Sequence, residues 1–469
     1  MGSPRTEIAA RRRTRGFTAT LIVALGVASA MPASANGRAP LATGITFGPR
    51  DTSSIYARTT FGVLVSHDDG CSFRWVCERA LGYAGDFDPK LAVSPDGTLF
   101  AATYSGLRVS RDDGCTWTEA TAELPARAPG RIAGIWIDAI DIAATGEIWI
   151  ATAESAAPNN VYRSTDNGVT FEPQNLQSPT VWWKSVRVAP SHARRIYVTG
   201  YQVAGTPSAW LQRSDDAGAT WTERPLAAAM QLGATPIVVV SAIDPADPDT
   251  LFVTSIGALP PGGDRLYRST DGGATFVQVF ETTARIRDVV HAADRSVYIA
   301  TSGNGTHRSI DGGETFQPAV GASGLGCLAQ RADGTLMGCD ANRAPDGGAS
   351  AATLGRAISR SSDGASWRPA LAFGEVVGPL ACGPGTTVHD ICAPMWPALR
   401  GVLGTTAPAK QCPLPPPRPR RAPTPPRTAK RDAGGCCETG SQRGASGAVV
   451  LAIVLGGVLR RRRLAARAG

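Results

Sequence analysis

The sequence predicts an all-β fold in which seven four-stranded antiparallel sheets form the blades of a β-propeller. Two observations predict this fold. The 469-residue chain contains 53 Gly and 35 Pro, a content typical of a protein with many turns and unlike that of a coiled coil. In addition, one eight-residue phrase recurs seven times between residues 44 and 372, with a mean period of about 49 residues, which suits a four-stranded blade.

The repeated phrase has the form Ser-x-Asp-x-Gly-x-Thr-Trp/Phe. Its Asp side chain can accept hydrogen bonds from backbone N–H groups farther along the turn, and its Gly supplies a positive φ. The closing Trp or Phe begins the next strand and buries a large apolar surface. The seventh copy, from Ser361, is one residue shorter than the others. We therefore expect seven equivalent turns, each held by a structural aspartate: Asp68, Asp112, Asp166, Asp216, Asp271, Asp311 and Asp363.

These phrases resemble the Asp-box, or BNR, repeat of sialidases, sortilin-type receptors, xyloglucan-degrading hydrolases and photosystem II assembly factors. The resemblance implies a β-propeller with the boxes on the blade periphery, away from the central ligand face. It does not imply one activity, because these families include hydrolases, receptors and assembly factors. A calcium site of the EF-hand type is not indicated, since the boxes lack its spaced acidic residues.

The first 35 residues have the pattern of a secretory signal peptide. Arginines at positions 11–13 precede an apolar run from Phe17 to Ala30, and Ala33-Ser34-Ala35 follows. This order predicts export and cleavage after Ala35. The alternative, a retained membrane helix, is disfavoured because the apolar run is too short for a hydrocarbon core of about 30 Å.

The other end of the chain predicts a spacer and a sorting tail. Residues 407–434 are rich in Pro and Arg, which favours an extended, unpacked linker. In residues 435–469, Gly435-Cys436-Cys437 precedes an apolar helix at 445–459 and four arginines at 460–463. This tail resembles the MYXO-CTERM sorting signal, which implies cleavage near Cys436 or Cys437 by sorting machinery and delivery to the cell surface. A membrane anchor that stays in place is the alternative.

The charge distribution argues against a nucleic-acid partner. The formal net charge of +8 divides into +4 for residues 1–35, +11 for residues 407–469 and −7 for residues 36–406. We take 36–406 as the propeller. An acidic propeller has no general attraction for phosphate backbones.

Ten cysteines in an exported chain predict disulfides. Cys327 and Cys339 lie symmetrically about a predicted hairpin turn, so we expect them to face each other across two strands. The same symmetry predicts a bridge between Cys382 and Cys392. Partners for Cys71, Cys77, Cys115 and Cys412 stay open, and no metal site is expected because Cys-x-x-Cys is absent and the five His are scattered.

The sequence shows no complete catalytic motif. The Arg-Ile-Pro element of sialidases is absent, as are the Gly-x-Ser-x-Gly elbow, the Walker loop and the His-Glu-x-x-His helix. A carboxylate pair for glycoside hydrolysis stays possible. Its candidates are the acids at or before predicted inner strands: Asp86, Asp88, Asp138, Asp141 and Asp288.

The sequence also suggests a ligand-binding cluster. Trp182 and Trp183 are adjacent on a predicted inner strand, so they point to opposite faces; one is expected in the core while the other can stack on a sugar or peptide. Lys184 follows them, and Arg287 and Asp288 are expected at the centre of the ring together with Arg285.

Together these features predict an exported cell-surface propeller that binds or scaffolds an extracellular glycan or protein, without cofactor, metal or nucleic acid. We expect the protein to contact the membrane through its C-terminal tail. The alternative function is a secreted glycoside hydrolase, and the sequence favours binding without catalysis.

Overall fold

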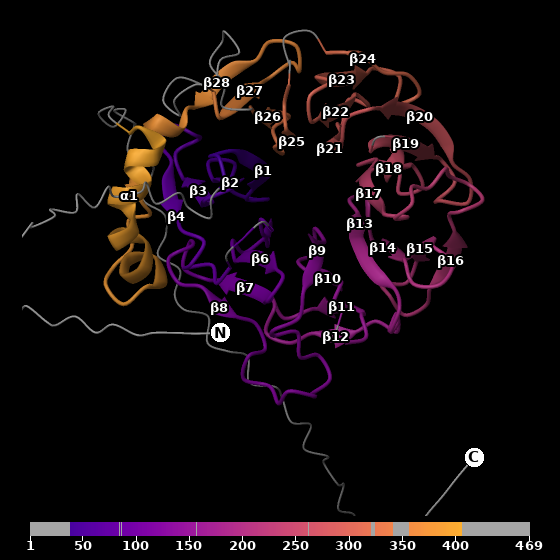
Figure 1. Ribbon diagram of the computed structural model, residues 1–469, viewed down its shortest axis with the longest axis horizontal. Helices are drawn as coiled ribbons and strands as arrows, with labels where there is room; N and C mark the ends of the chain where they lie inside the picture. The colour runs from indigo at the N-terminus through magenta and orange to yellow at the C-terminus, as the bar shows by residue number, and fades with distance from the viewer. Residues whose placement is uncertain are drawn as a thin grey trace, which may run out of the picture. The chain divides into compact units, whose positions relative to one another are not determined.

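The computed structural model describes residues 38–405, except 84, 86, 156, 261, 320–323 and 341–355. In this part, seven blades, each of four antiparallel strands, are arranged around an axis as a β-propeller (Figure 1). The predicted fold class is confirmed. The predicted signal peptide, the linker and the sorting tail lie outside the described residues.

Each blade is a meander of four consecutive strands. Blades 1 to 3 comprise β1 (Ala42–Phe47), β2 (Ile55–Thr59), β3 (Gly62–Ser66), β4 (Arg74–Val76); β5 (Lys90–Val93), β6 (Leu99–Thr103), β7 (Gly106–Ser110), β8 (Thr118–Glu119); and β9 (Ile137–Ile142), β10 (Ile148–Thr152), β11 (Val161–Ser164), β12 (Glu172–Pro173). Blades 4 and 5 comprise β13 (Trp182–Ala189), β14 (His192–Gln202), β15 (Ser208–Ser214), β16 (Thr222–Pro225); and β17 (Val238–Ile243), β18 (Leu251–Leu259), β19 (Gly263–Ser269), β20 (Val277–Thr282). Blades 6 and 7 comprise β21 (Ile286–His291), β22 (Val297–Thr301), β23 (Thr306–Ser309), β24 (Gln317–Pro318); and β25 (Cys327–Gln330), β26 (Leu336–Cys339), β27 (Ile358–Ser361), β28 (Arg368–Leu371).

The first strand of every blade is innermost, and the first strands of successive blades contact one another around the ring (Figure 1). β25 contacts β1, so the ring closes between blades 7 and 1. Second strands such as β6, β10 and β22 are buried at every residue, as expected of strands covered on both faces. The apolar core therefore lies between the blades.

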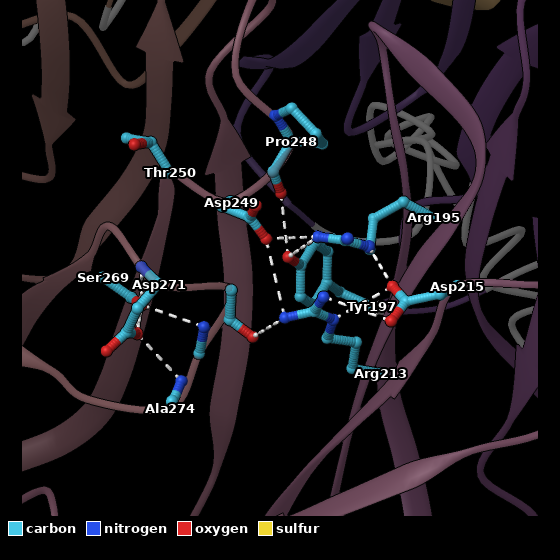
Figure 2. A network of polar contacts seen from close by, with 12 residues as sticks. Arg195, Tyr197, Arg213, Asp215, Pro248, Asp249, Thr250, Ser269, Asp271 and Ala274 are labelled. Atoms are coloured by element: carbon cyan, nitrogen blue, oxygen red, sulfur yellow. Dashed lines mark hydrogen bonds and ion pairs between the residues drawn. The ribbon is translucent and has the colours of Figure 1, made fainter.

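The seven predicted turns join the third and fourth strands, because the serine of each phrase is the last residue of the third strand. Blade 5 shows the hydrogen bonds (Figure 2): the Ser269 hydroxyl donates to Asp271 Oδ1 at 2.8 Å, and the Gly273 amide donates to Ser269 Oγ at 2.9 Å. The amide and hydroxyl of Thr275 donate to the same carboxylate at 2.9 and 2.6 Å. The aspartate thus organises the turn as the sequence predicts.

The glycine of the phrase has a second role that the sequence did not indicate. A Cβ on Gly168 would lie 2.6 Å from a ring carbon of Phe100, a residue of the preceding blade. Gly218 against Trp149 and Gly313 against Phe252 repeat this arrangement, at 2.7 and 2.3 Å. The box therefore also lets neighbouring blades approach closely, and a larger residue would separate them.

A C-terminal strap follows the last blade, formed by residues 372–405. It contains η2 (Phe373–Glu375), β29 (Gly378–Pro379), η3 (Val388–Cys392) and α1 (Ala393–Leu403). β29 pairs in parallel with β4, the outer strand of blade 1. Disulfides then join Cys392 to Cys77 of blade 1 and Cys382 to Cys115 of blade 2. The strap thus links the end of blade 7 covalently to the first two blades.

The predicted bridge between Cys382 and Cys392 is wrong. The segment between them enters the helical turns of η3 instead of forming a hairpin, and each cysteine faces a different blade. The bridge between Cys327 and Cys339 is confirmed, because these residues are direct partners on β25 and β26 with Cα atoms 4.8 Å apart. Cys71 is also disulfide-bonded.

Helix α1 was not predicted from the sequence. It ends at Gly404, whose φ of 62° closes the last turn, and it buries Leu399 and Leu403 against the first blade's core. Within the described residues no helix has both the length and the apolar character needed to cross a membrane. The apolar helix predicted at 445–459 lies outside them and stays a prediction.

Candidate functional site

The two rims of the ring differ in what they carry. Strands alternate in direction, so the first strands begin at the rim where the second strands end, and the third strands end at the opposite rim. We call these the entry rim and the box rim. All seven boxes therefore lie at the box rim, whereas Trp182, Lys184 and their neighbours lie at the entry rim.

An aromatic row follows the entry rim across blades 2 to 4. The ring centroids of Phe87 and Trp136 are 5.3 Å apart, and those of Trp136 and Trp182 are 6.1 Å apart. Tyr201, the direct partner of Trp182 on β14, extends the row at 5.9 Å. Phe87 is 58% exposed and the two tryptophans are half-buried. The row thus offers aromatic surface to a ligand.

A row of charges accompanies the aromatic row on the same three blades. Asp138 of β9 lies between Lys90 of β5 and Lys184 of β13, with N–O distances of 3.1 and 2.5 Å. Asp138 is buried and both lysines are more exposed. Partial burial lowers the pKa of Lys90, an effect that Asp138 opposes. Two cations therefore share one carboxylate at the entry rim.

The two rows share a sequence pattern of which only some residues were predicted. In blades 3 and 4 the aromatic residue stands two positions before the charged one, as in Trp136 with Asp138 and Trp182 with Lys184; in blade 2, Phe87 stands three before Lys90. Both charged residues stand at an irregularity of the first strand, because the pairing register shifts at Asp138 on β9 and at Lys184 on β13. Trp182, Lys184 and, as a carboxylate candidate, Asp138 were predicted from the sequence, but Phe87, Trp136, Lys90 and Tyr201 were missed. Aligning the repeats on their inner strands would have pointed to Trp136, which stands directly before β9, whereas Tyr201 lies on the second strand β14.

Trp182 and Trp183 lie on opposite faces of β13. Trp183 is buried, and its Nε1–H donates to the Leu176 carbonyl at 2.9 Å. Trp182 belongs to the aromatic row. The role of either residue in ligand binding stays a prediction.

The acids nearer the centre of the ring connect neighbouring first strands. Asp141 Oδ2 accepts the Val188 amide of the next blade at 2.8 Å, and Asp288 Oδ2 accepts the Leu328 amide of the next blade at 2.9 Å. Asp88 pairs with Arg38 at 2.5 Å, and Asp86 lies outside the described residues. Each described carboxylate candidate therefore has a structural partner.

Burial changes the acidity of the two central carboxyls. It raises the pKa of Asp288 to about 6, although the Leu328 amide and three arginines, Arg58, Arg187 and Arg287, oppose the shift. Burial likewise raises the pKa of Asp141, against the effect of Arg187. The structure places Arg287 exposed on β21 next to Asp288, whereas Arg285 pairs with Asp264 at 3.1 Å.

The box rim carries charges too, but they are paired. Figure 2 shows Arg195 and Arg213 of blade 4 between two acids, Asp215 of blade 4 and Asp249 of blade 5. The Tyr197 hydroxyl also donates to the Pro248 carbonyl at 2.8 Å. This network joins two blades and pairs each of its arginines with carboxylates. Across the described ranges no cluster of three or more metal-ligating side chains occurs.

Comparison with known proteins gives fold likenesses only. No protein-family model matches the chain, and no curated protein matches it by sequence. A GH74 enzyme from Niastella koreensis is 16% identical, with a TM-score of 0.40, and the match covers 70% of this chain and 65% of that one. YCF48 from Cyanidioschyzon merolae is 16% identical, with a TM-score of 0.44 and coverage of 64% and 92%. A gluconolactonase from Xanthomonas campestris is 16% identical, with a TM-score of 0.37 and coverage of 56% and 84%. Likenesses this distant transfer no activity to this chain.

Proposed function

We propose that the protein is a cell-surface binding module that takes an extracellular glycan on the entry rim. The main support for this proposal is the aromatic row. Three ring-to-ring contacts align Phe87, Trp136, Trp182 and Tyr201 beside a row of charges. Aromatic faces beside a few fixed polar groups are the usual composition of sites for small polar ligands. A protein ligand is the alternative occupant of the same rim.

The state of the acids supports binding over catalysis. Asp138 is held by two lysines, and Asp141 and Asp288 each accept a backbone amide from the neighbouring blade. A hydrolase of the two-carboxylate type needs one acid that can give its proton to the leaving group and another that is free to act as base or nucleophile. Carboxylates that hold the strands together are poorly placed for these roles.

The test is a glycan-array screen of the purified full-length protein, followed by affinity measurements for Trp182→Ala and Trp182→Phe. We expect Trp182→Ala to weaken binding about tenfold or more, because a central aromatic contact is lost, and Trp182→Phe to retain most of the affinity. Ile310→Ala is the control, since Ile310 is 80% exposed at the box rim. Unchanged binding by Trp182→Ala would contradict the proposed site, and binding of protein ligands alone would favour the alternative occupant.

One observation favours the alternative function, glycoside hydrolysis. A pKa of about 6 suits Asp288 to act as a general acid at mildly acidic pH. Turnover of bound polysaccharides is to be measured for wild type and for Asp138→Asn, Asp141→Asn and Asp288→Asn. Turnover that one of these changes abolishes would establish a hydrolase and overturn the binding-module proposal.

The same proposal includes the localisation of the protein. The signal peptide ending at Ala35, the spacer at 407–434 and the tail with Cys436 and Cys437 support an exported protein held at the outer surface or released from it. Deleting residues 435–469 is expected to release the protein into the medium. A deletion variant that stays wholly cell-associated would contradict the sorting tail.

A further inference from the structure

The centre of the ring carries arginines that have no carboxylate partner among the described residues. Arg187 of β13 and Arg287 of β21 are exposed, and neither forms an ion pair within that part of the chain. Arg187 Nε donates to the Val240 carbonyl at 3.4 Å. Arg58 of β2 is half-buried and donates to Thr43 and to the Pro89 carbonyl. Guanidinium groups from blades 1, 4 and 6 thus bring positive charge to the centre.

Two of these arginines lie on first strands, which are innermost in the ring: Arg187 on β13 and Arg287 on β21. Together with Arg58 of blade 1 they oppose the rise in the pKa of the Asp288 carboxyl. Arg187 acts on Asp141 as well. Both acids are already bonded to backbone amides of the next blade, at 2.8 and 2.9 Å. Each acid accepts one of these amides, and among the described residues neither acid forms an ion pair with the three arginines.

The excess of positive charge is local. Residues 36–406 carry a net charge of −7, and the network at the box rim pairs its arginines with acids. At the entry rim, in contrast, Lys90 and Lys184 share Asp138. A basic centre in an acidic body attracts anions to that centre in preference to the rest of the described ring.

We propose that this centre binds the carboxylate groups of an acidic polysaccharide, with uronate residues as the recognised sugars. The inference rests on the proposed function, because it names the class of glycan held at the entry rim. On β13, Trp182 and Arg187 pair with Tyr201 and Tyr197, which are four positions apart on β14, so Arg187 lies about 13 Å along the strand from the aromatic row. A polymer can span that distance, with sugar rings on the aromatic row and carboxylates at the arginines, which bind carboxylates in a planar, two-point geometry.

The test compares two forms of one polymer, polygalacturonate and its methyl ester, which share a backbone and differ in charge. We expect the full-length protein to bind polygalacturonate at least tenfold more tightly than the ester. The double variant Arg187→Gln/Arg287→Gln should lose about tenfold or more in affinity for polygalacturonate and little for the ester. Arg224→Gln is the matched control, because Arg224 is exposed on the outer strand β16. Thermal unfolding of each variant checks that the fold is kept.

Three outcomes overturn the inference: no binding of polygalacturonate by wild type, equal binding of both polymers, or unchanged affinity in the double variant. Its failure is distinguishable from failure of the proposed function. If Trp182→Ala abolishes binding of a neutral glycan while the arginine variant binds it normally, the entry rim is a glycan site and only the acidic-ligand inference is wrong.

Discussion

The box rim and the entry rim are built from the two ends of the same strands, yet they differ in how their polar groups are used. At the box rim the same turn recurs seven times, and its serine, aspartate and threonine bond to one another and to the local backbone. At the entry rim, blades 2 to 4 carry aromatic residues and shared charges. At the centre, Asp288 accepts a backbone amide of the next blade, and arginines from three blades oppose the rise in its pKa.

Aspartate illustrates this difference most directly. The amide and hydroxyl of Thr220 and the hydroxyl of Ser214 lower the pKa of Asp216 to about 2 at the box rim. Burial raises the pKa of Asp288 to about 6 at the centre. The box position of blade 4 stabilises the charged form of Asp216, whereas the central position in blade 6 penalises the charged form of Asp288. Repetition therefore marks residues that build the fold, and departures from it mark where a ligand can act.

The strap is an exception to the rule that repeated features build the fold. It occurs once in the chain, yet its role is structural. Replacing the four cysteines that tie the strap to the ring, Cys382 and Cys392 of the strap with Cys115 and Cys77 of the blades, by serine is expected to lower the free energy of unfolding by about 2–5 kcal/mol per bridge removed. The bridges span 315 and 267 residues, against 12 for Cys327 and Cys339. Urea unfolding should therefore show a smaller loss when Cys327 and Cys339 are replaced. Equal losses per bridge would show that the strap does not act by closing the ring.

The pH dependence of stability tests the contrast between the two aspartates. Between about pH 4 and pH 6 folded Asp288 keeps a proton that an unfolded aspartate has lost, so its contribution to stability is fully present below about pH 4 and is lost as pH rises through 6. Asp288→Asn keeps an oxygen for the Leu328 amide and removes this loss. The variant should gain up to about 2–3 kcal/mol relative to wild type across that window.

Urea unfolding at several pH values measures this gain. Asp216→Asn is the contrasting control, because a lowered pKa gives stability that is present at neutral pH and lost on acidification. Curves for wild type and Asp288→Asn that run parallel from pH 4 to pH 7 would contradict the raised pKa.

The smallest expected effect on stability concerns the left-handed backbone conformation within one box turn. Ala217 stands at the fourth box position with φ of 60°, where blades 5 and 6 have Gly272 and Gly312. A left-handed conformation costs an alanine about 1 kcal/mol, so Ala217→Gly should raise the free energy of unfolding by about 0.5–1 kcal/mol. Ala219→Gly, two positions on and without a positive φ, should lower it slightly. A loss of stability in Ala217→Gly would show that the alanine side chain contributes more by packing than it costs in strain.

Local features of the sequence predicted most of the fold, because each box is a short self-contained turn. Seven serines at the ends of third strands, and the hairpin that places Cys327 opposite Cys339, depend only on residues near in sequence. The predicted bridge between Cys382 and Cys392 was wrong because their true partners are distant in the sequence. Their partners, Cys115 and Cys77, are 267 and 315 residues away, and nothing local indicates that the chain returns to blades 1 and 2.

The candidate site shows the same division. Trp182 and Lys184 were identified from their places on a predicted inner strand, yet the residues that continue their two rows, Phe87, Trp136 and Lys90, come from other blades. The sequence by itself determined the blade, its turn and the number of repeats, because these follow from hydrogen bonds within a few residues. Only the tertiary structure decided which aromatic rings align, which charges are shared and where the strap is fastened, because radial packing of the blades brings residues tens to hundreds of positions apart into contact.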